Sequence, residues 1–103
     1  MDNETNISFI TPNHQLIRQT TFTSFKRYHK FINWVSGEFD LYLQDESNGL
    51  HVFFPEGKFH IKNGNEKDNA VVAEIHIESK VLQKGIDMIE EIMSVYYLLA
   101  KIP

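Results

Sequence analysis

Glutamate and histidine alternate in the segment EIHIE, which spans residues 74–78. At this spacing, imidazole and carboxylate groups lie on one face of a β-strand, where they could bind a metal ion or transfer protons. The pattern is also typical of the solvent-exposed side of a strand whose other side buries Ile75 and Ile77. We favour this second interpretation, for reasons that depend on the neighbouring strands.

The pairing of strands predicts where two further histidines lie. A tight turn at residues 55–56 pairs His51 with His60, and the next hairpin pairs His60 with His76. Both registers create one continuous apolar face, which a shift of one residue in either hairpin would destroy. That face consists of Leu50, Val52, Phe54, Phe59, Ile61, Ala73, Ile75 and Ile77.

His51, His60 and His76 then form a row on the polar face, which we call the histidine row. One hypothesis is a weak metal or small-ligand site at this row. The hypothesis that we favour is a row of polar histidines between exposed ion pairs, because lysines beside the row repel a divalent cation. We therefore expect no bound metal and no cofactor. The expected ion pairs are Lys58–Glu78 and Lys62–Glu74.

Basic and aromatic residues are interleaved in SFKRYHKFINW, residues 24–34. Lys26, Arg27, Lys30 and Trp34 could bind the phosphates and stack on the bases of single-stranded nucleic acid. On a helix, however, the aromatic residues of this segment are expected to be buried and the basic ones solvated. The net charge of −4 also disfavours nucleic acid, so this function is an alternative.

Composition narrows the remaining classes of function. The chain has no cysteine, so thiol chemistry and cysteine-ligated zinc are excluded. We find no phosphate-binding loop and no catalytic motif, and we do not expect an enzyme. We expect instead a non-catalytic protein-binding module, such as a small acidic inhibitor or immunity-type protein with a basic partner. The residues expected to bind this partner are Asp40, Asp45, Glu46, Asp87, Glu90 and Glu91.

The hydrophobic pattern predicts an α+β fold with an antiparallel meander sheet of four to five strands. Period-two alternation predicts a strand at 38–44, a turn at 45–49, and strands at 50–54, 58–62 and 70–78, with a polar loop at 63–69. Residues 7–10 are expected to form a further short strand. A long amphipathic helix is expected from about residue 80, capped by Ser79, and should pack on the apolar face of the sheet.

Residues 14–36 allow two interpretations. A stripe of apolar residues from Phe25 to Val35 predicts a helix at about 24–36, capped by Ser24 and ended by Gly37. The many β-branched and aromatic residues instead favour strands. In that case the fold would be a mostly β sandwich closed by the C-terminal helix, as in PH-like domains.

Length and hydropathy set the organisation of the chain. We expect residues 1–103 to form one domain, without a membrane span. The first residues lack the basic and apolar regions of a signal peptide, so we expect a cytoplasmic protein. Apolar residues 96–99 near the end of the C-terminal helix are a candidate contact for a homodimer.

Overall fold

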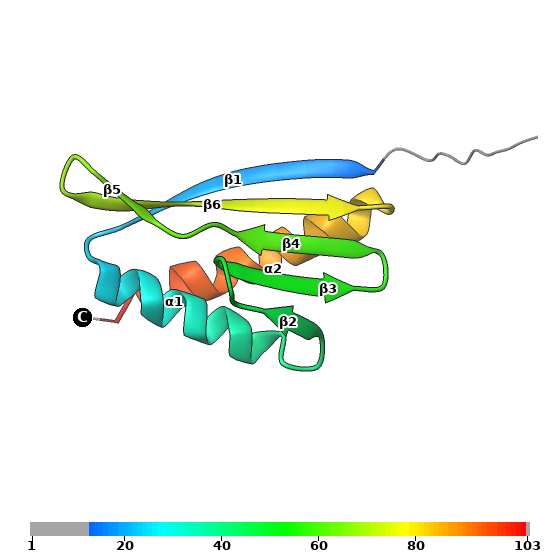
Figure 1. Ribbon diagram of the computed structural model, residues 1–103, viewed down its shortest axis with the longest axis horizontal. Helices are drawn as coiled ribbons and strands as arrows, with labels where there is room; N and C mark the ends of the chain where they lie inside the picture. The colour runs from blue at the N-terminus through cyan, green and yellow to red at the C-terminus, as the bar shows by residue number, and fades with distance from the viewer. Residues whose placement is uncertain (1–12, 103) are drawn as a thin grey trace, which may run out of the picture.

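The structure is a computed structural model that describes residues 13–102, and it shows an α+β fold (Figure 1). The strand expected at 7–10 lies outside these residues. In chain order the elements are β1 (His14–Phe22), α1 (Phe25–Glu38), β2 (Leu43–Asp45), β3 (Leu50–Phe54), β4 (Gly57–Ile61), β5 (Asn65–Lys67), β6 (Ala70–Ser79) and α2 (Leu82–Ala100).

The strands form one open antiparallel sheet in the order β1-β6-β4-β3-β2, and β5 pairs with one end of β6. Both helices lie on the same side of this sheet (Figure 1), so the domain has two layers and the sheet has one open face. The predicted meander is present as β2, β3, β4 and β6. Two further strands, β1 and β5, make the sheet larger than expected.

The predicted registers are confirmed in both hairpins. His51 pairs with His60, and His60 pairs with His76. All eight residues of the predicted apolar face are buried, with at most 7% of any one exposed. They form one core with the inner sides of the two helices. Alternation therefore fixes which face of each strand is buried.

β5 is a strand that the sequence pattern did not reveal, and β1 was expected only in the strand interpretation of residues 14–36. β1 pairs with β6 along nine residues, yet Thr20 is its one buried residue. An edge strand of this kind has no alternating pattern to detect. β5 lies within the predicted polar loop, and its tight turn to β6 places Asp68 and Asn69 at positive φ, as in a type I′ turn.

Helix α1 confirms the helical interpretation of residues 24–36, so the β-sandwich alternative is wrong. The Ser24 hydroxyl accepts a hydrogen bond from the Arg27 amide at 3.2 Å, as a capping residue does. The prediction that Gly37 ends the helix is wrong, because the buried stripe continues to Phe39. The Phe39 ring packs on Phe59 at 5.0 Å between centroids, which extends the helix through Gly37.

The predicted strand at 38–44 is therefore also wrong. Its first residues belong to the end of α1 and the following turn, and only Leu43–Asp45 pair with β3. The alternation that suggested a strand has a different cause. Phe39 is buried as the last residue of the helical stripe, whereas Leu41 is 96% exposed and Leu43 is 74% exposed.

The C-terminal helix is confirmed, but Ser79 is not its capping residue. Ser79 is the last residue of β6, and its buried hydroxyl bonds both the amide and the carbonyl of Val81. The chain therefore turns before α2 begins at Leu82. Neither helix in the described part of the chain is long and apolar enough to cross a membrane.

We expect opposite effects from the same substitution at two glycines. Gly57 lies so close to β6 that an added Cβ would sit 1.9 Å from the Glu78 carbonyl oxygen, whereas an added Cβ at Gly37 would meet no atom within 4 Å. Gly57→Ala should lower the free energy of unfolding by about 1–3 kcal/mol, as overpacking does. Gly37→Ala, the matched control, should raise it by about 0.5–1 kcal/mol through better helix propensity.

Urea denaturation of the two variants and the wild type measures both changes. A Gly57→Ala variant as stable as the wild type would contradict the close approach of β4 to β6.

Candidate functional site

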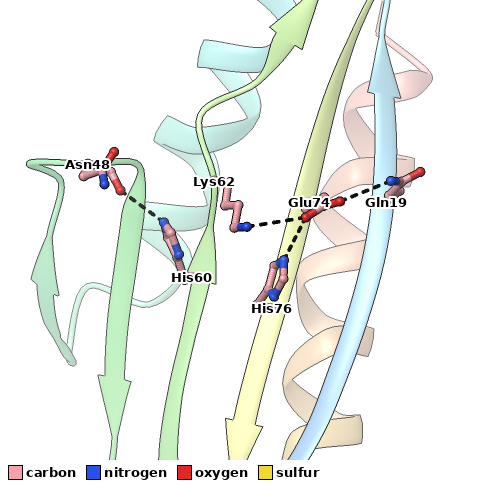
Figure 2. Close-up of polar contacts among 6 residues, drawn as sticks. All are labelled: Gln19, Asn48, His60, Lys62, Glu74 and His76. Carbon is pink, nitrogen blue, oxygen red and sulfur yellow. Dashed lines mark hydrogen bonds and ion pairs between the residues drawn. The ribbon is translucent and has the colours of Figure 1, made fainter.

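The open face of the sheet carries the side chains that could take part in chemistry or binding (Figure 2). Cross-strand pairing sets Ile17, His76, His60, His51 and Asp45 in one line across five strands. The histidine row thus exists as predicted, between an isoleucine on β1 and a carboxylate on β2. A shallow cavity of about 210 Å³ lies over the row.

His51 and His60 stack on each other and share one hydrogen-bond acceptor. Their ring centroids are 3.8 Å apart and the rings are within 12° of parallel. Each Nε2 lies 3.1 Å from the backbone carbonyl oxygen of Asn48, in the turn before β3. Gly49 makes this turn, with a φ of 78° and no room for a Cβ beside the Ile61 carbonyl.

His76 turns away from the other two histidines toward Glu74. Its Nε2 lies 2.9 Å from Glu74 Oε1 (Figure 2). The same carboxylate accepts a hydrogen bond from the Gln19 side chain and forms an ion pair with Lys62 at 3.7 Å. These contacts lower the pKa of Glu74, chiefly through the His76 and Gln19 hydrogen bonds. The predicted Lys62–Glu74 pair is thus present.

The second predicted ion pair does not form. Lys58 and Glu78 lie opposite each other on β4 and β6, but Glu78 accepts a hydrogen bond from the side chain of Asn13 instead. Exposed pairs of this kind are worth about 0–1 kcal/mol, so another hydrogen-bonding group easily replaces one.

Hydrogen bonding fixes the protonation of the histidine row. Carbonyl and carboxylate oxygens only accept, so each Nε2 must carry the proton that it donates. The Nε2 atoms of His51 and His60 thus both donate to the Asn48 carbonyl, and His76 points toward Glu74 instead. Among residues 13–102, no group of three histidine, aspartate or glutamate side chains is placed to hold a metal ion.

The surroundings of His60 disfavour a positive charge on its ring. The pKa of His60 is lowered, chiefly by burial and further by the neighbouring charges of His51, His76 and Lys62. The hydrogen bond to the Asn48 carbonyl acts in the opposite direction and raises this pKa. The arrangement can therefore respond to pH.

The predicted acidic residues divide into two groups. Asp40, Asp45 and Glu46 surround β2, at the edge of the sheet, and all three are exposed. Leu41 and Leu43 lie between Asp40 and Asp45 in the chain and are exposed, and Leu43 pairs with Phe53, which is 39% exposed on the open face. We call these six residues the acidic corner. The carboxylates were predicted from the sequence but the leucines were not, because the expected strand at 38–44 set Leu41 and Leu43 on the same side as Phe39.

Specific hydrogen bonds hold the acidic corner in place. The Gln44 side-chain amide donates to the carbonyls of Ser36 and Phe39 at 2.9 and 2.8 Å, and so caps the end of α1. The Ser47 amide donates to Asp45 at 2.9 Å, and this bond and the Ser47 hydroxyl lower the pKa of Asp45. The corner is therefore a supported surface rather than a loose loop.

The other predicted acids, Asp87, Glu90 and Glu91, lie on the exposed side of α2. They belong to the helical layer, and Glu91 lies beside Glu38 at the end of α1. Partial burial raises the pKa of Glu91, and the nearby carboxylate of Glu38 on α1 raises it further.

The basic residues of the alternative function lie on α1. Lys26, Lys30 and Trp34 are exposed and Arg27 is half-buried. The expectation that Trp34 is buried is wrong, because it lies outside the stripe of Tyr28, Phe31, Ile32 and Val35 and is 44% exposed. The three-residue and four-residue steps from Arg27 to Lys30 to Trp34 place these side chains along one side of the helix.

Comparison with models of known protein families and with curated protein sequences finds no match for this chain. We therefore infer its function from its residues and geometry. The homodimer contact expected at residues 96–99 stays a prediction. Its Tyr97 and Leu98 are each about half exposed, and Leu99 is buried.

The lowered pKa of His60 predicts a loss of stability in mild acid. The unfolded chain takes up a proton near pH 6.5, whereas the folded histidine does so only at lower pH. The free energy of unfolding should therefore fall as the pH drops below about 6.5, and level off below the folded pKa. Urea denaturation from pH 7.5 to 5.0 measures this fall.

His60→Gln should flatten this pH dependence, and His29→Gln, an exposed histidine on α1, should leave it in place. An NMR titration that gives His60 a pKa above 6.5 would contradict the prediction.

We expect zinc to leave the melting temperature unchanged at neutral pH. Binding through Nε2 would break the hydrogen bonds to Asn48 and Glu74, and Lys58 and Lys62 stand beside the row. Thermal melts of the wild type and His60→Ala, each with and without zinc, provide the test. A large rise in melting temperature with zinc, seen in the wild type but not in His60→Ala, would establish a metal site at the histidine row.

Proposed function

We propose that this protein is a non-catalytic protein-binding module that binds a basic partner through the acidic corner. The observation that carries the proposal is the exposure of Leu41 and Leu43, at 96% and 74%, beside three carboxylates. Large apolar side chains on a supported surface gain binding energy when a partner covers them. Full burial of one leucine is worth about 1.5–3 kcal/mol.

Charge supports a basic partner. The chain contains no lysine or arginine from Phe31 to Gly57, a stretch that includes the whole acidic corner. The nearest lysine on the open face is Lys58, which pairs with Phe53 at the boundary of the corner. Uncompensated carboxylates around an apolar centre steer a cationic partner and exclude anionic ones.

The backbone of β2 supports the same proposal. β2 is the edge strand of the sheet and pairs with β3 on one side. Edge strands offer free N–H and C=O groups that a partner's extended segment can use. The partner would then bind by strand addition at Leu43–Asp45, with Leu41 and Leu43 as apolar anchors.

We further propose that binding neutralises the partner, as expected of a small acidic inhibitor or immunity-type protein. A corner that combines apolar anchors with carboxylates is suited to cover a basic surface, such as one that binds phosphate groups. Asp87, Glu90 and Glu91 take no part in this interface, because they lie on the helical layer.

Capture from extracts of the source cells, followed by binding measurements with the purified partner, tests the proposal. The variant Leu41→Ser/Leu43→Ser should raise Kd by at least about tenfold through the loss of buried apolar area. The variant Asp40→Asn/Asp45→Asn/Glu46→Gln should slow association and reduce its dependence on salt. The captured protein should be basic.

Two matched controls complete this experiment. Asp87→Asn/Glu90→Gln/Glu91→Gln removes the same number of charges from α2, and Ile17→Ser removes an exposed apolar residue from the other edge strand. Both should bind as the wild type does. A partner that loses affinity for the controls, but not for the corner variants, would place the interface elsewhere.

A further inference from the structure

A cavity of about 480 Å³ opens on the side of the molecule where the two helices meet the end of β1. It lies between the beginning of α1 and the end of α2, and we call it the α1–α2 groove. Small-molecule sites commonly have volumes of about 300–1,000 Å³. The groove is lined by Thr21, Phe22, Thr23, Arg27, Lys30, Tyr96, Leu99 and Ala100.

The lining of the groove is positively charged in an acidic protein. Arg27 and Lys30 lie one helical turn apart on α1 and both line the cavity, whereas no acidic side chain of residues 13–102 does. Among residues 13–102, Lys62 forms an ion pair with Glu74, whereas neither Arg27 nor Lys30 forms an ion pair. The hydroxyls of Thr21 and Thr23 add hydrogen-bond donors to the same wall.

Of the two cations, Arg27 is placed against the preference of the helix. Lys26 and Arg27 lie in the first turn of α1, which contains no acidic residue, and the positive end of the helix dipole is there. A cation at this position costs roughly 0.3–1 kcal/mol of helix stability. An anion bound in the groove would be attracted by both the side chains and the helix end.

The base of the groove is aromatic and rigid. The Phe22 ring lies 5.4 Å from Tyr96 and 5.2 Å from Phe31, measured between centroids. The Tyr96 hydroxyl donates to the Thr21 carbonyl at 2.8 Å, which ties α2 to β1. Edge-to-face packing and this hydrogen bond keep the Tyr96 ring in one orientation, so a flat group can pack on it without rearrangement.

We propose that the α1–α2 groove binds a small organic anion in which a phosphate, sulfonate or carboxylate is attached to a flat aromatic group. Arg27 and Lys30 bind the anionic group, and the aromatic group packs beside Phe22 and Tyr96. The groove lies on the helical layer and does not include the acidic corner, so this site is independent of the proposed function. No chemical change of the ligand is implied.

NMR titrations with AMP and with 8-anilinonaphthalene-1-sulfonate test the proposal, because both combine an anionic group with flat rings. At least one should produce saturable shifts in the backbone amides of residues 21–23, 27–30 and 96–100. Arg27→Gln/Lys30→Gln should weaken that binding on the order of tenfold or more, as loss of hydrogen bonds to a charged group does. Added salt should weaken wild-type binding.

Lys58→Gln/Lys62→Gln is the matched control, because it removes the same charge from the open face of the sheet. It should bind within about twofold of the wild type, since distant exposed charges are screened. The spectra of the unliganded variants report whether each one is folded. Should the groove variant unfold, Thr23→Glu places a negative charge in the exposed wall and should weaken binding in the same way.

Three results would overturn the proposal. The first is the absence of saturable shifts with either probe, and the second is equal binding by the wild type and the folded groove variant. The third is binding of a single-stranded oligonucleotide that depends on Arg27, Lys30 and Trp34 while neither small probe binds. That last result would instead assign the groove and Trp34 to nucleic acid.

Discussion

The alternation of β6 is the constraint on which the rest of the structure depends. Its residues Ala70–Ser79 alternate without interruption between buried and half-buried positions, and it pairs with β1, β4 and β5. A shift of one residue would turn Glu74, His76 and Glu78 into the core, where unpaired carboxylates are very costly. The burial pattern of β6 therefore fixes which of its side chains face the core. Hydrogen bonding to β6 then sets the register of β1, β4 and β5.

The same pleat determines what the open face can do. Each residue that β6 buries under the helices is followed by one that it presents to solvent, so the histidine row is a consequence of the core. Near β6 these polar groups bind one another, and Glu74 alone contacts Gln19, Lys62 and His76. Toward β2, Leu43 and Phe53 pair with each other and face solvent, and Asp45 lies two residues beyond Leu43 on the same strand. The partner-binding proposal depends on this change along the face.

Helix α1 separates two regions of opposite charge. Its first turns carry Lys26, Arg27 and Lys30 beside the α1–α2 groove, and its end leads through Glu38 and Asp40 into the acidic corner. This order is the reverse of the one that stabilises a helix through its dipole. Charges that oppose a local preference of this kind, without a gain in stability, often belong to functional surfaces. Both ends of α1 carry charges that oppose the helix dipole, and we propose a different ligand for each end.

The sequence by itself determined the parts of the fold in which local pattern and burial agree. Strands β3, β4 and β6, their registers, the histidine row and the presence of the C-terminal helix follow from periods of two and of three to four residues, which the pleat and the helix impose on any chain. Residues 14–36 stayed open between a helix and strands, because β1 is an edge strand with one buried residue and carries no clear period. The end of α1 was misplaced, because Gly37 predicts a stop that burial of Phe39 against Phe59 overrides. Only the tertiary structure decided that Leu41 and Leu43 are exposed beside Asp40 and Asp45, and that Arg27 and Lys30 meet Tyr96 across a groove. The groove joins residues of β1, α1 and α2 that packing brings together, and such packing leaves no period in the sequence. The acidic corner lies within residues 40–46 and Phe53 on the neighbouring strand, and there packing decided which side chains are exposed.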